Sequence, residues 1–261
     1  MHRVCVLGLL AACGGGGGFP DANQKIDAAP PSATFSLAWS VTDMAGSPVA
    51  CDKIGAISVT VLAHNQGFDG GTSEVFTCGT GMGMSPKLPP GTWDFEFQLG
   101  NAAGVIATAP GQHSVTLTDG QNTELMPLTF SVDPTGGLAL TVATGRVNGN
   151  CAAPPDGGGI TSTTITLEHS SDQTCAPLTF SLSGGGTYTV DCANPVVAAC
   201  IDSTETLTVT SVPSDNYTIH VKGYVGSTLC WTNNDSLQVP SQAATLTKTL
   251  NLAYATSTPG C

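Results

Sequence analysis

The feature that most constrains this chain is an alternation of apolar and polar residues that is written twice along its length. Phe35, Leu37, Trp39 and Val41 alternate with small residues, which is the period of a strand with one buried face. Turns rich in glycine, proline and aspartate separate this run from similar ones, and no window shows a convincing helical period. An all-β fold is therefore predicted. The later runs are Ile57/Val59/Val61, Trp93/Phe95/Phe97/Leu99, Val115/Leu117 and Leu128/Phe130/Val132.

The pattern restarts after the turn at residues 133–136. Val115 and Leu237 are 122 positions apart, and so are Val132 and Tyr254, so the last block repeats at a constant offset. We therefore predict two tandem antiparallel β-sandwich domains, at residues 34–132 and 137–254, followed by a C-terminal tail at 255–261. The other expected equivalences are Leu138, Leu140 and Val142 with Phe35, Leu37 and Trp39; Ile165 and Leu167 with Val59 and Val61; and Tyr217, Ile219 and Val221 with Trp93, Phe95 and Phe97.

A short stretch at the start of one predicted strand resembles a known sandwich family. Leu88-Pro89-Pro90-Gly91-Thr92-Trp93-Asp94-Phe95 is similar to the turn and strand of bacterial prealbumin-like domains, also called carboxypeptidase regulatory-like domains. That resemblance implies a seven-stranded sandwich without catalytic residues of its own. The second unit departs from the motif at Val212–Tyr217. Immunoglobulin-like sandwiches fit the strand pattern equally well.

The N-terminus has the form of a bacterial secretion signal. A basic start at residues 1–3 precedes a short apolar run, and Leu10-Ala11-Ala12-Cys13 follows. This tetrad resembles the lipobox of bacterial lipoproteins, which implies removal of residues 1–12 and acylation of Cys13. An ordinary signal peptide with a chance cysteine is the alternative. Residues 13–33 would then be a glycine- and proline-rich tether, and Gly14 in place of an aspartate favours the outer membrane.

The net charge of the processed chain makes polyanionic partners improbable. After loss of residues 1–12, six basic and 19 acidic residues remain, a net charge of −13. An acidic surface repels phosphate backbones and anionic headgroups, so nucleic acid is an improbable partner. The acyl chains on Cys13 would be the membrane attachment, because no later apolar run is long enough to span a bilayer.

Eight cysteines would remain for disulfides in an exported chain. Cys78 and Cys200 are separated by the repeat offset, and each unit has a cysteine soon after its first strand. This predicts Cys51–Cys78 and Cys151–Cys200. The second interval is 22 residues longer and holds two strand-like segments around Ser183–Gly186, so a hairpin closed by a disulfide is expected there. The last two predicted bridges are Cys175–Cys192 and, by elimination, Cys230–Cys261.

The sequence contains no recognisable arrangement of catalytic residues. His64, His113, His169 and His220 are scattered singly, and the sequence contains neither a GxSxG nor an SxxK motif, so we expect no catalytic site, metal site or cofactor. Two acidic loops are candidate calcium sites, one with Asp119, Asn122 and Glu124 and the other with Asp202 and Glu205, but neither has the spacing of an EF-hand loop. Trp39 and Trp93 should be core residues, and Asp94 and Glu96 should take the opposite, polar face of the Trp93 strand. Trp231 is the one tryptophan expected to be partly exposed, although packing beside the Cys230 disulfide is the commoner role for a residue in this position.

The sequence thus predicts a non-enzymatic, lipid-anchored envelope protein. Its leading function is a binding or structural module for a protein or glycan partner. Two alternatives stay open: an envelope hydrolase with an unrecognised site, and a subunit of an exported complex that pairs through exposed sheet edges.

Overall fold

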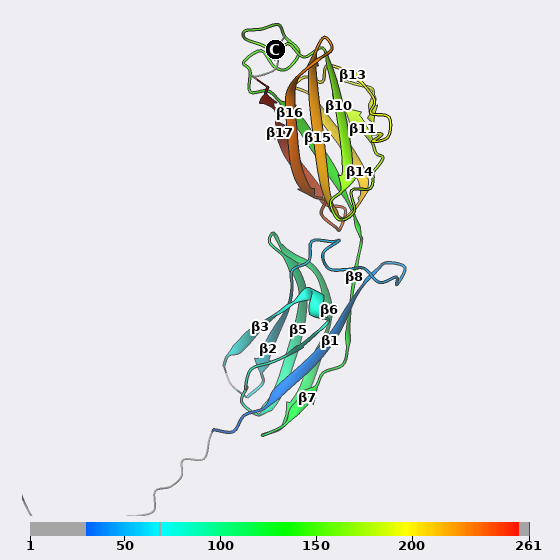
Figure 1. Ribbon diagram of the computed structural model, residues 1–261. Coiled ribbons are helices and arrows are strands. Elements are labelled where there is room, and N and C mark those ends of the chain that lie inside the picture. Colours follow the sequence, from blue (N-terminus) through cyan, green and yellow to red (C-terminus); the bar gives the residue numbers. More distant parts are fainter. Residues whose placement is uncertain (1–29, 68, 256–260) are drawn as a thin grey trace, which may run out of the picture. The chain divides into compact units, whose positions relative to one another are not determined.

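The computed structural model describes residues 30–67, 69–255 and 261, and these are almost entirely strands and turns (Figure 1). The one helical element in this part of the chain is the 3-10 turn η1 (Cys78–Thr80). No helix of the described residues has the length and hydropathy needed to cross a membrane. The predicted all-β sandwich class is confirmed. Cys13 and the expected tether up to residue 29 lie outside the described residues.

The first repeat, defined as residues 34–132, consists of two facing sheets. One has the order β4-β1-β7, with β8 also paired to β1, and the other has the order β3-β2-β5-β6. Its strands are β1 (Thr34–Asp43), β2 (Ser58–Asn65), β3 (Gly71–Thr77), β4 (Met82–Met84), β5 (Gly91–Asn101), β6 (Gly104–Leu117), β7 (Asn122–Glu124) and β8 (Leu128–Val132).

The second repeat, defined as residues 135–254, also has two sheets, of five strands each. Their orders are β12-β11-β14-β9-β17 and β13-β10-β15-β16-β18. The strands are β9 (Thr135–Ala143), β10 (Ser162–His169), β11 (Thr179–Leu182), β12 (Thr187–Thr189), β13 (Ala198–Ala199), β14 (Thr206–Pro213), β15 (Asn216–Val225), β16 (Thr228–Gln238), β17 (Thr245–Asn251) and β18 (Ala253–Tyr254).

Each repeat has its own hydrophobic core. In the first repeat the inward side chains of β1 and β5 meet, and the rings of Phe35 and Phe95 pack edge to face with centroids 5.0 Å apart. The core of the second repeat is a separate cluster around Phe180, Tyr188 and Ile219. Burying one such side chain stabilises the fold by about 1.5–3 kcal/mol. Because Ser32–Cys261 form one compact unit, the division into two independent domains stays a prediction.

Strand pairing corrects one expected equivalence. Phe97 lies opposite Val61 on β2, and the equivalent Val221 lies opposite Ile165 on β10. Ile165 therefore corresponds to Val61 and Leu167 to Ala63, two residues away from the expected match. The error arose because a strand of alternating small apolar residues looks the same when it is shifted by two.

The first and last long strands of each repeat pair in parallel. β1 pairs with β8, where Trp39 lies opposite Leu128, and β9 pairs with β17, where Val142 lies opposite Leu250. The expected antiparallel sandwich is thus mixed along one edge of the first strand in each repeat, and in the first repeat β7 also pairs with this edge in parallel. Side-chain alternation cannot distinguish the two directions, because both bury alternate residues.

Both repeats contain a hydrogen bond from a buried aromatic side chain to the backbone of a preceding turn. Trp93 Nε1 donates a hydrogen bond to the Pro89 carbonyl oxygen (3.1 Å). At the equivalent position, Tyr217 Oη donates to the Pro213 carbonyl oxygen (2.9 Å). In both repeats a buried aromatic residue thus fixes the turn that enters the central strand.

Candidate functional site

The four disulfides join the cysteine pairs expected from the sequence. Their Cα atoms are 5.4–6.0 Å apart, within the range that a bridge requires. Cys175–Cys192 closes the base of the β11–β12 hairpin, which is the insertion that lengthens the second repeat. The remaining bridges are Cys51–Cys78, Cys151–Cys200 and Cys230–Cys261.

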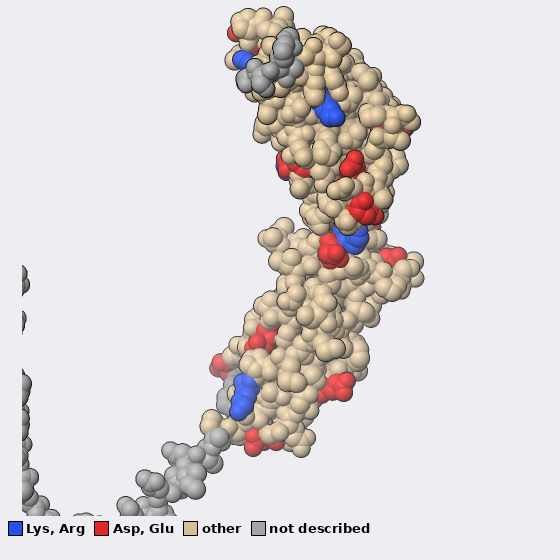
Figure 2. Space-filling model, in the orientation of Figure 1, with Lys and Arg blue, Asp and Glu red and all other residues tan. Residues whose placement is uncertain are grey.

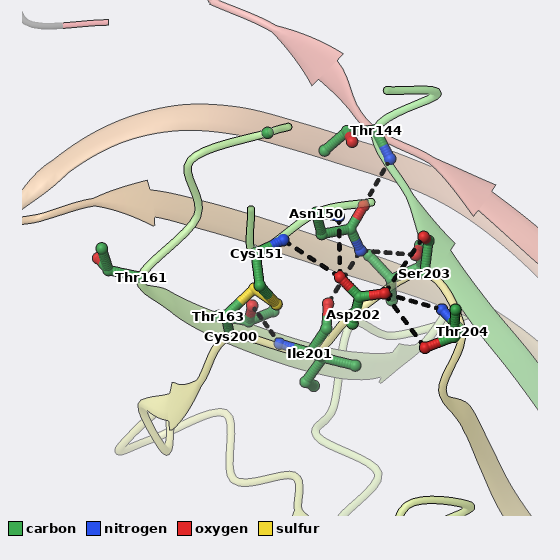
Figure 3. The surroundings of a disulfide bond; sticks show 12 residues. Thr144, Asn150, Cys151, Thr161, Thr163, Cys200, Ile201, Asp202, Ser203 and Thr204 are labelled. Carbon is green, nitrogen blue, oxygen red and sulfur yellow. Dashed lines mark hydrogen bonds between the residues drawn. A yellow bond between two sulfur atoms is a disulfide. The ribbon is translucent and has the colours of Figure 1, made fainter. Parts of the chain in front are cut away.

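A polar network surrounds the Cys151–Cys200 bridge (Figure 3). The fully buried Asn150 accepts the Thr144 N–H (2.8 Å) and donates to the carbonyl oxygens of Val142 (2.7 Å) and Ile201 (2.9 Å). Every polar atom of its amide group is therefore engaged, and the loop that carries Cys151 is fixed to β9. The network supports the fold and leaves no group directed toward a ligand.

Asp202 completes this network. Its carboxylate accepts the backbone N–H groups of Asn150 (3.1 Å), Cys151 (3.2 Å) and Thr204 (3.2 Å). Burial raises the pKa of the carboxyl group, but the hydrogen bonds from Cys151, Thr204 and Asn150 outweigh burial, and the pKa lies below its ordinary value. Because Asp202 is committed to the backbone, it is unsuited to be a calcium ligand.

The other candidate loop is also engaged in closing the fold. Asp119 Oδ1 accepts the Ser32 N–H (2.8 Å), and Asn122 exchanges hydrogen bonds with Thr34 Oγ1 (3.1 Å) and Ser36 Oγ (2.9 Å). Within residues 30–67, 69–255 and 261, no group of three or more His, Cys, Asp or Glu side chains is placed to hold a metal ion.

The expected partial exposure of Trp231 is wrong, because the residue is only 3% exposed, and the alternative of a packing role is correct. Its indole N–H donates to the Gly158 carbonyl oxygen (2.9 Å), and the ring of Tyr254 packs against it with centroids 4.7 Å apart. The short strand β18 pairs with β16 at this position and brings Tyr254 over the indole. Trp39 and Trp93 are core residues, as predicted.

A hollow on the outer face of the β3-β2-β5-β6 sheet brings several polar side chains together. Its volume is about 600 Å³, within the range of small-ligand sites. His64 lies directly opposite Asp94 across β2 and β5, and His113 Nδ1 from β6 is 3.4 Å from Asp94 Oδ1. We call this hollow the trough. Its lining residues are Leu62, Ala63, His64, Gly71, Thr72, Ser73, Asp94, Glu96 and His113.

Asp94 is held in place on the trough wall. Gln66 Nε2 donates to both of its carboxylate oxygens at 3.0 Å, and the Ser114 N–H donates to Oδ1 at 2.8 Å. These hydrogen bonds, with the Gln66 amide contributing most, lower the pKa of the Asp94 carboxyl group below its ordinary value. The trough therefore contains an oriented carboxylate that stays ionised at neutral pH.

Sequence reasoning placed Asp94 and Glu96 on the polar face of their strand but missed the trough. Residues 64, 94 and 113 are distant in sequence, so spacing alone could not bring their side chains together. The missing signal was strand register, which places β2 beside β5 and β5 beside β6. The remaining histidines lie elsewhere: His169 Nδ1 is 2.8 Å from Asp215 Oδ2, and His220 lies on the polar face of β15 opposite Asn234.

Comparison with known proteins adds no identification. The sequence matches no protein-family model and no curated protein. The shaft pilin SpaA from Lactobacillus rhamnosus GG is 11% identical with a TM-score of 0.29, and the match covers 86% of this chain and 98% of the pilin. A streptococcal ancillary pilin is 11% identical with a TM-score of 0.28, and the match covers 84% of this chain and 63% of that pilin. A leucine-rich repeat protein from Bacteroides thetaiotaomicron is 13% identical with a TM-score of 0.26, and the match covers 85% of this chain and 26% of that protein. This chain thus spans about a quarter of the leucine-rich repeat protein. Similarities at this level carry no argument about function.

Proposed function

We propose that the protein is a lipid-anchored component of the bacterial cell envelope, most simply at the outer membrane, and that its first repeat binds a glycan without catalysing a reaction. The anchor is proposed from Leu10-Ala11-Ala12-Cys13 and the apolar run before it. Four disulfides support export, because such bridges persist in oxidising compartments and are rare in the cytosol.

The observation that carries the binding proposal is the preorganised Asp94 carboxylate in the trough. Sugar hydroxyl groups both donate and accept hydrogen bonds, and the trough offers carboxylates, imidazoles and hydroxyl groups for both directions. A carboxylate that is already oriented loses little conformational freedom when a ligand binds. Asp94 and Glu96 repel anions, so the proposed ligand is a neutral glycan.

The second repeat carries different chemistry at the same place. Thr218 and Glu168 lie opposite each other where the first repeat has Asp94 and His64. The sandwich therefore does not require the Asp94–His64 pair for folding. This difference locates the proposed binding function in the first repeat and supplies a matched substitution for testing it.

A hydrolase with this trough is less well supported. Glycoside hydrolysis needs one carboxyl group whose pKa is raised so that it can donate a proton. The pKa of Asp94 is lowered instead, chiefly by the Gln66 hydrogen bonds. Asp94 is thus suited to accept hydrogen bonds from a bound ligand.

The anchor is tested by changing its cysteine. Cys13→Ala should abolish acylation, and the chain should leave the membrane fraction or accumulate as an uncut precursor. Mass spectrometry of the wild-type N-terminus should find the acylated cysteine as the first residue. An unmodified mature N-terminus at another position would refute the anchor and leave the trough proposal intact.

Glycan binding is tested on a glycan array with the full chain and two variants. Asp94→Thr introduces the residue of the second repeat and should weaken binding of neutral glycans at least tenfold. Asp156→Thr removes an exposed carboxylate from a loop of the second repeat and should leave binding unchanged. Equal binding by wild type and Asp94→Thr, or binding of acidic glycans alone, would contradict the proposal.

A further inference from the structure

The two repeats differ at one sheet edge on a different surface from the trough. In the second repeat β14 lies between β9 and β11, so it is paired on both sides. Its counterpart β4 pairs with β1, and no second partner strand exists among the described residues. The register makes Met82, Gly83 and Met84 equivalent to Thr206, Leu207 and Thr208. β11 pairs with Leu207 and Thr208, so it occupies the edge that is open at Gly83 and Met84.

The open edge presents backbone groups for pairing. Trp39 N–H donates to the Gly81 carbonyl oxygen, and Ser85 N–H donates to the Phe35 carbonyl oxygen, each at 2.9 Å. Because bonded residues alternate along an antiparallel pair, Gly83 also faces β1, and Met82 and Met84 face away from it. The Thr80 hydroxyl group donates to the Met82 carbonyl oxygen (2.9 Å). Among residues 30–67, 69–255 and 261, the outward backbone N–H and C=O of Met84 have no partner.

An apolar hollow lies beside this edge on the outer face of the sheet. Its volume is about 360 Å³, and Met82 and Met84 border it at 69% and 62% exposure. Glu124 on β7 borders it too, and Met84 and Glu124 both pair with Ser36 of β1, one from each side. Methionine is flexible and polarizable, which suits surfaces that adapt to a partner's side chain.

The fold does not require these side chains. The second repeat has Thr206 and Thr208 at the positions of Met82 and Met84, and Thr247 at the position of Glu124. Threonine suits an exposed strand, whereas two exposed methionines expose apolar surface to water at a cost of about 25 cal/mol per Å². The combination of an open edge, an apolar hollow and one acidic group is thus specific to the first repeat.

Charge and the repeat together identify the occupant. The chain itself covers the equivalent edge with a β-strand, so a strand is the element that fits there. Residues 34–132 contain eight acidic residues and two lysines, and Glu124 borders the hollow. A second copy would bring the same negative charge to the edge and would be repelled. A basic partner would be attracted.

We propose that the β4 edge binds an extended strand of a basic protein partner. The partner's main chain pairs with Met84, an apolar side chain enters the hollow beside Met82, and a lysine or arginine next to it reaches Glu124. This is strand addition, in which main-chain hydrogen bonds supply affinity and alternate side chains supply specificity. The site is independent of the trough.

The test uses the full chain and two ten-residue peptides as probes. In one peptide isoleucine and lysine alternate with threonine, and in the other glutamate replaces lysine. The lysine peptide should bind at least tenfold more tightly in fluorescence anisotropy and should slow hydrogen exchange of the Met84 amide. The glutamate peptide should bind weakly, and high salt should reduce the difference between them.

Three variants separate the parts of the site. Met84→Pro removes the outward N–H while the β1 pairing is kept, since proline is tolerated where an edge faces solvent, and it should abolish binding. The double variant Met82→Thr/Met84→Thr and the single variant Glu124→Thr introduce the residues of the second repeat and should each weaken binding about tenfold. Met44→Thr changes an exposed methionine outside the hollow and should bind normally.

Several results would overturn the proposal. They are full binding by Met84→Pro with its thermal transition unchanged, equal binding of the two peptides, and no binding of either. Concentration-dependent dimerisation of wild type that Met84→Pro abolishes would assign the edge to a second copy instead. Loss of glycan binding in Asp94→Thr has no bearing on these outcomes, because Asp94 lies on the other sheet.

Discussion

The two repeats have the same strand arrangement but differ in their disulfides and in their exposed side chains. Each closes its first strand against its last in parallel, and each fixes the turn before its central strand with a buried aromatic residue. The first repeat has one disulfide, two neighbouring histidines around Asp94 and four exposed methionines. The second has three disulfides and an additional hairpin on its edge. The features that support the two binding proposals are therefore concentrated in the repeat with fewer disulfides.

The protein surface carries few charged side chains. Lysine and arginine appear at few places on the visible face, and acidic side chains are scattered among uncharged ones (Figure 2). Exposed threonine replaces charge on many strands of the second repeat, as on β14 and β17. In such surroundings a single carboxylate such as Glu124 is a distinctive local feature.

The largest expected effect tests whether each repeat folds independently when the two are separated. Residues 30–134 and 135–261, produced as two fragments, should each show a cooperative thermal transition, because the two apolar cores share no residue. Calorimetry of each fragment under oxidising conditions gives the answer. If neither fragment unfolds cooperatively, the repeats form one domain and the predicted division is wrong.

Removing one disulfide at a time should show whether each bridge acts within its own repeat. Cys151→Ala/Cys200→Ala opens a loop of 49 residues and should cost about 4 kcal/mol by chain entropy, against about 3.5 kcal/mol for the 27-residue loop of Cys51–Cys78. Chemical denaturation followed in each fragment measures both costs. Non-reducing peptide mapping of the wild type should find the four bridges, and a bridge between the repeats would contradict the assignment.

The equivalent hydrogen bonds of Trp93 and Tyr217 should respond differently to high pH. Tyr217→Phe leaves the Pro213 carbonyl oxygen without its donor and should cost about 1–2 kcal/mol. Burial and, to a lesser extent, the negative Asp215 raise the pKa of Tyr217 to about 12. The unfolded chain has a tyrosine pKa near 10, so this stabilisation is complete below about pH 10 and is lost as the pH rises toward 12.

The measurement is the free energy of unfolding as a function of pH for wild type and Tyr217→Phe. Their difference should shrink between pH 10 and pH 12, while tyrosinate absorbance reports the ionisation. Trp93→Phe in the first repeat supplies the control, because an indole does not titrate in this range. A Tyr217 that ionises at its ordinary pKa would contradict the buried hydrogen bond.

The smallest expected effect concerns Asp202. Asp202→Asn keeps the shape of the side chain and weakens its hydrogen bonds to three backbone N–H groups, at a cost of about 1 kcal/mol for a group that water still reaches. The pKa of Asp202 is lowered in the folded chain, so its contribution is complete above the unfolded value near 4 and is lost as pH falls further. Acid titration of stability should therefore be flatter in the variant.

The sequence allowed the strands, the repeat and the cysteine pairs to be anticipated because each leaves a periodic trace. Alternation identified the inward faces of β1 and β5, and the 122-residue offset related Cys78 to Cys200. Other features leave no such trace. The parallel β1–β8 pairing, the two-residue shift at Ile165 and the burial of Trp231 under Tyr254 depend on which strands become neighbours.

The proposed sites were hidden for the same reason. Asp94 was recognised as outward-facing, but its proximity to His64 and His113 requires three strands in register. Met82 and Met84 alternate with glycines in the sequence, and the open edge beside them is recognisable only by comparison with β14. A repeat thus offers a comparison that a single domain does not provide.

The parallel closure has a consequence for the order in which the chain folds. Thr34 pairs with Asn122, and Gly137 pairs with Thr245, so the parallel pairing of each first strand cannot form until nearly the whole repeat has been synthesised. Contacts between such distant residues slow folding, because a long loop must be ordered before they form. Until then one edge of β1 has unpaired backbone groups, although β4 can already pair with its other edge. Cys175 and Cys192 are only 17 residues apart and close a much shorter loop, so we expect the β11–β12 hairpin to form before the sheet that it joins.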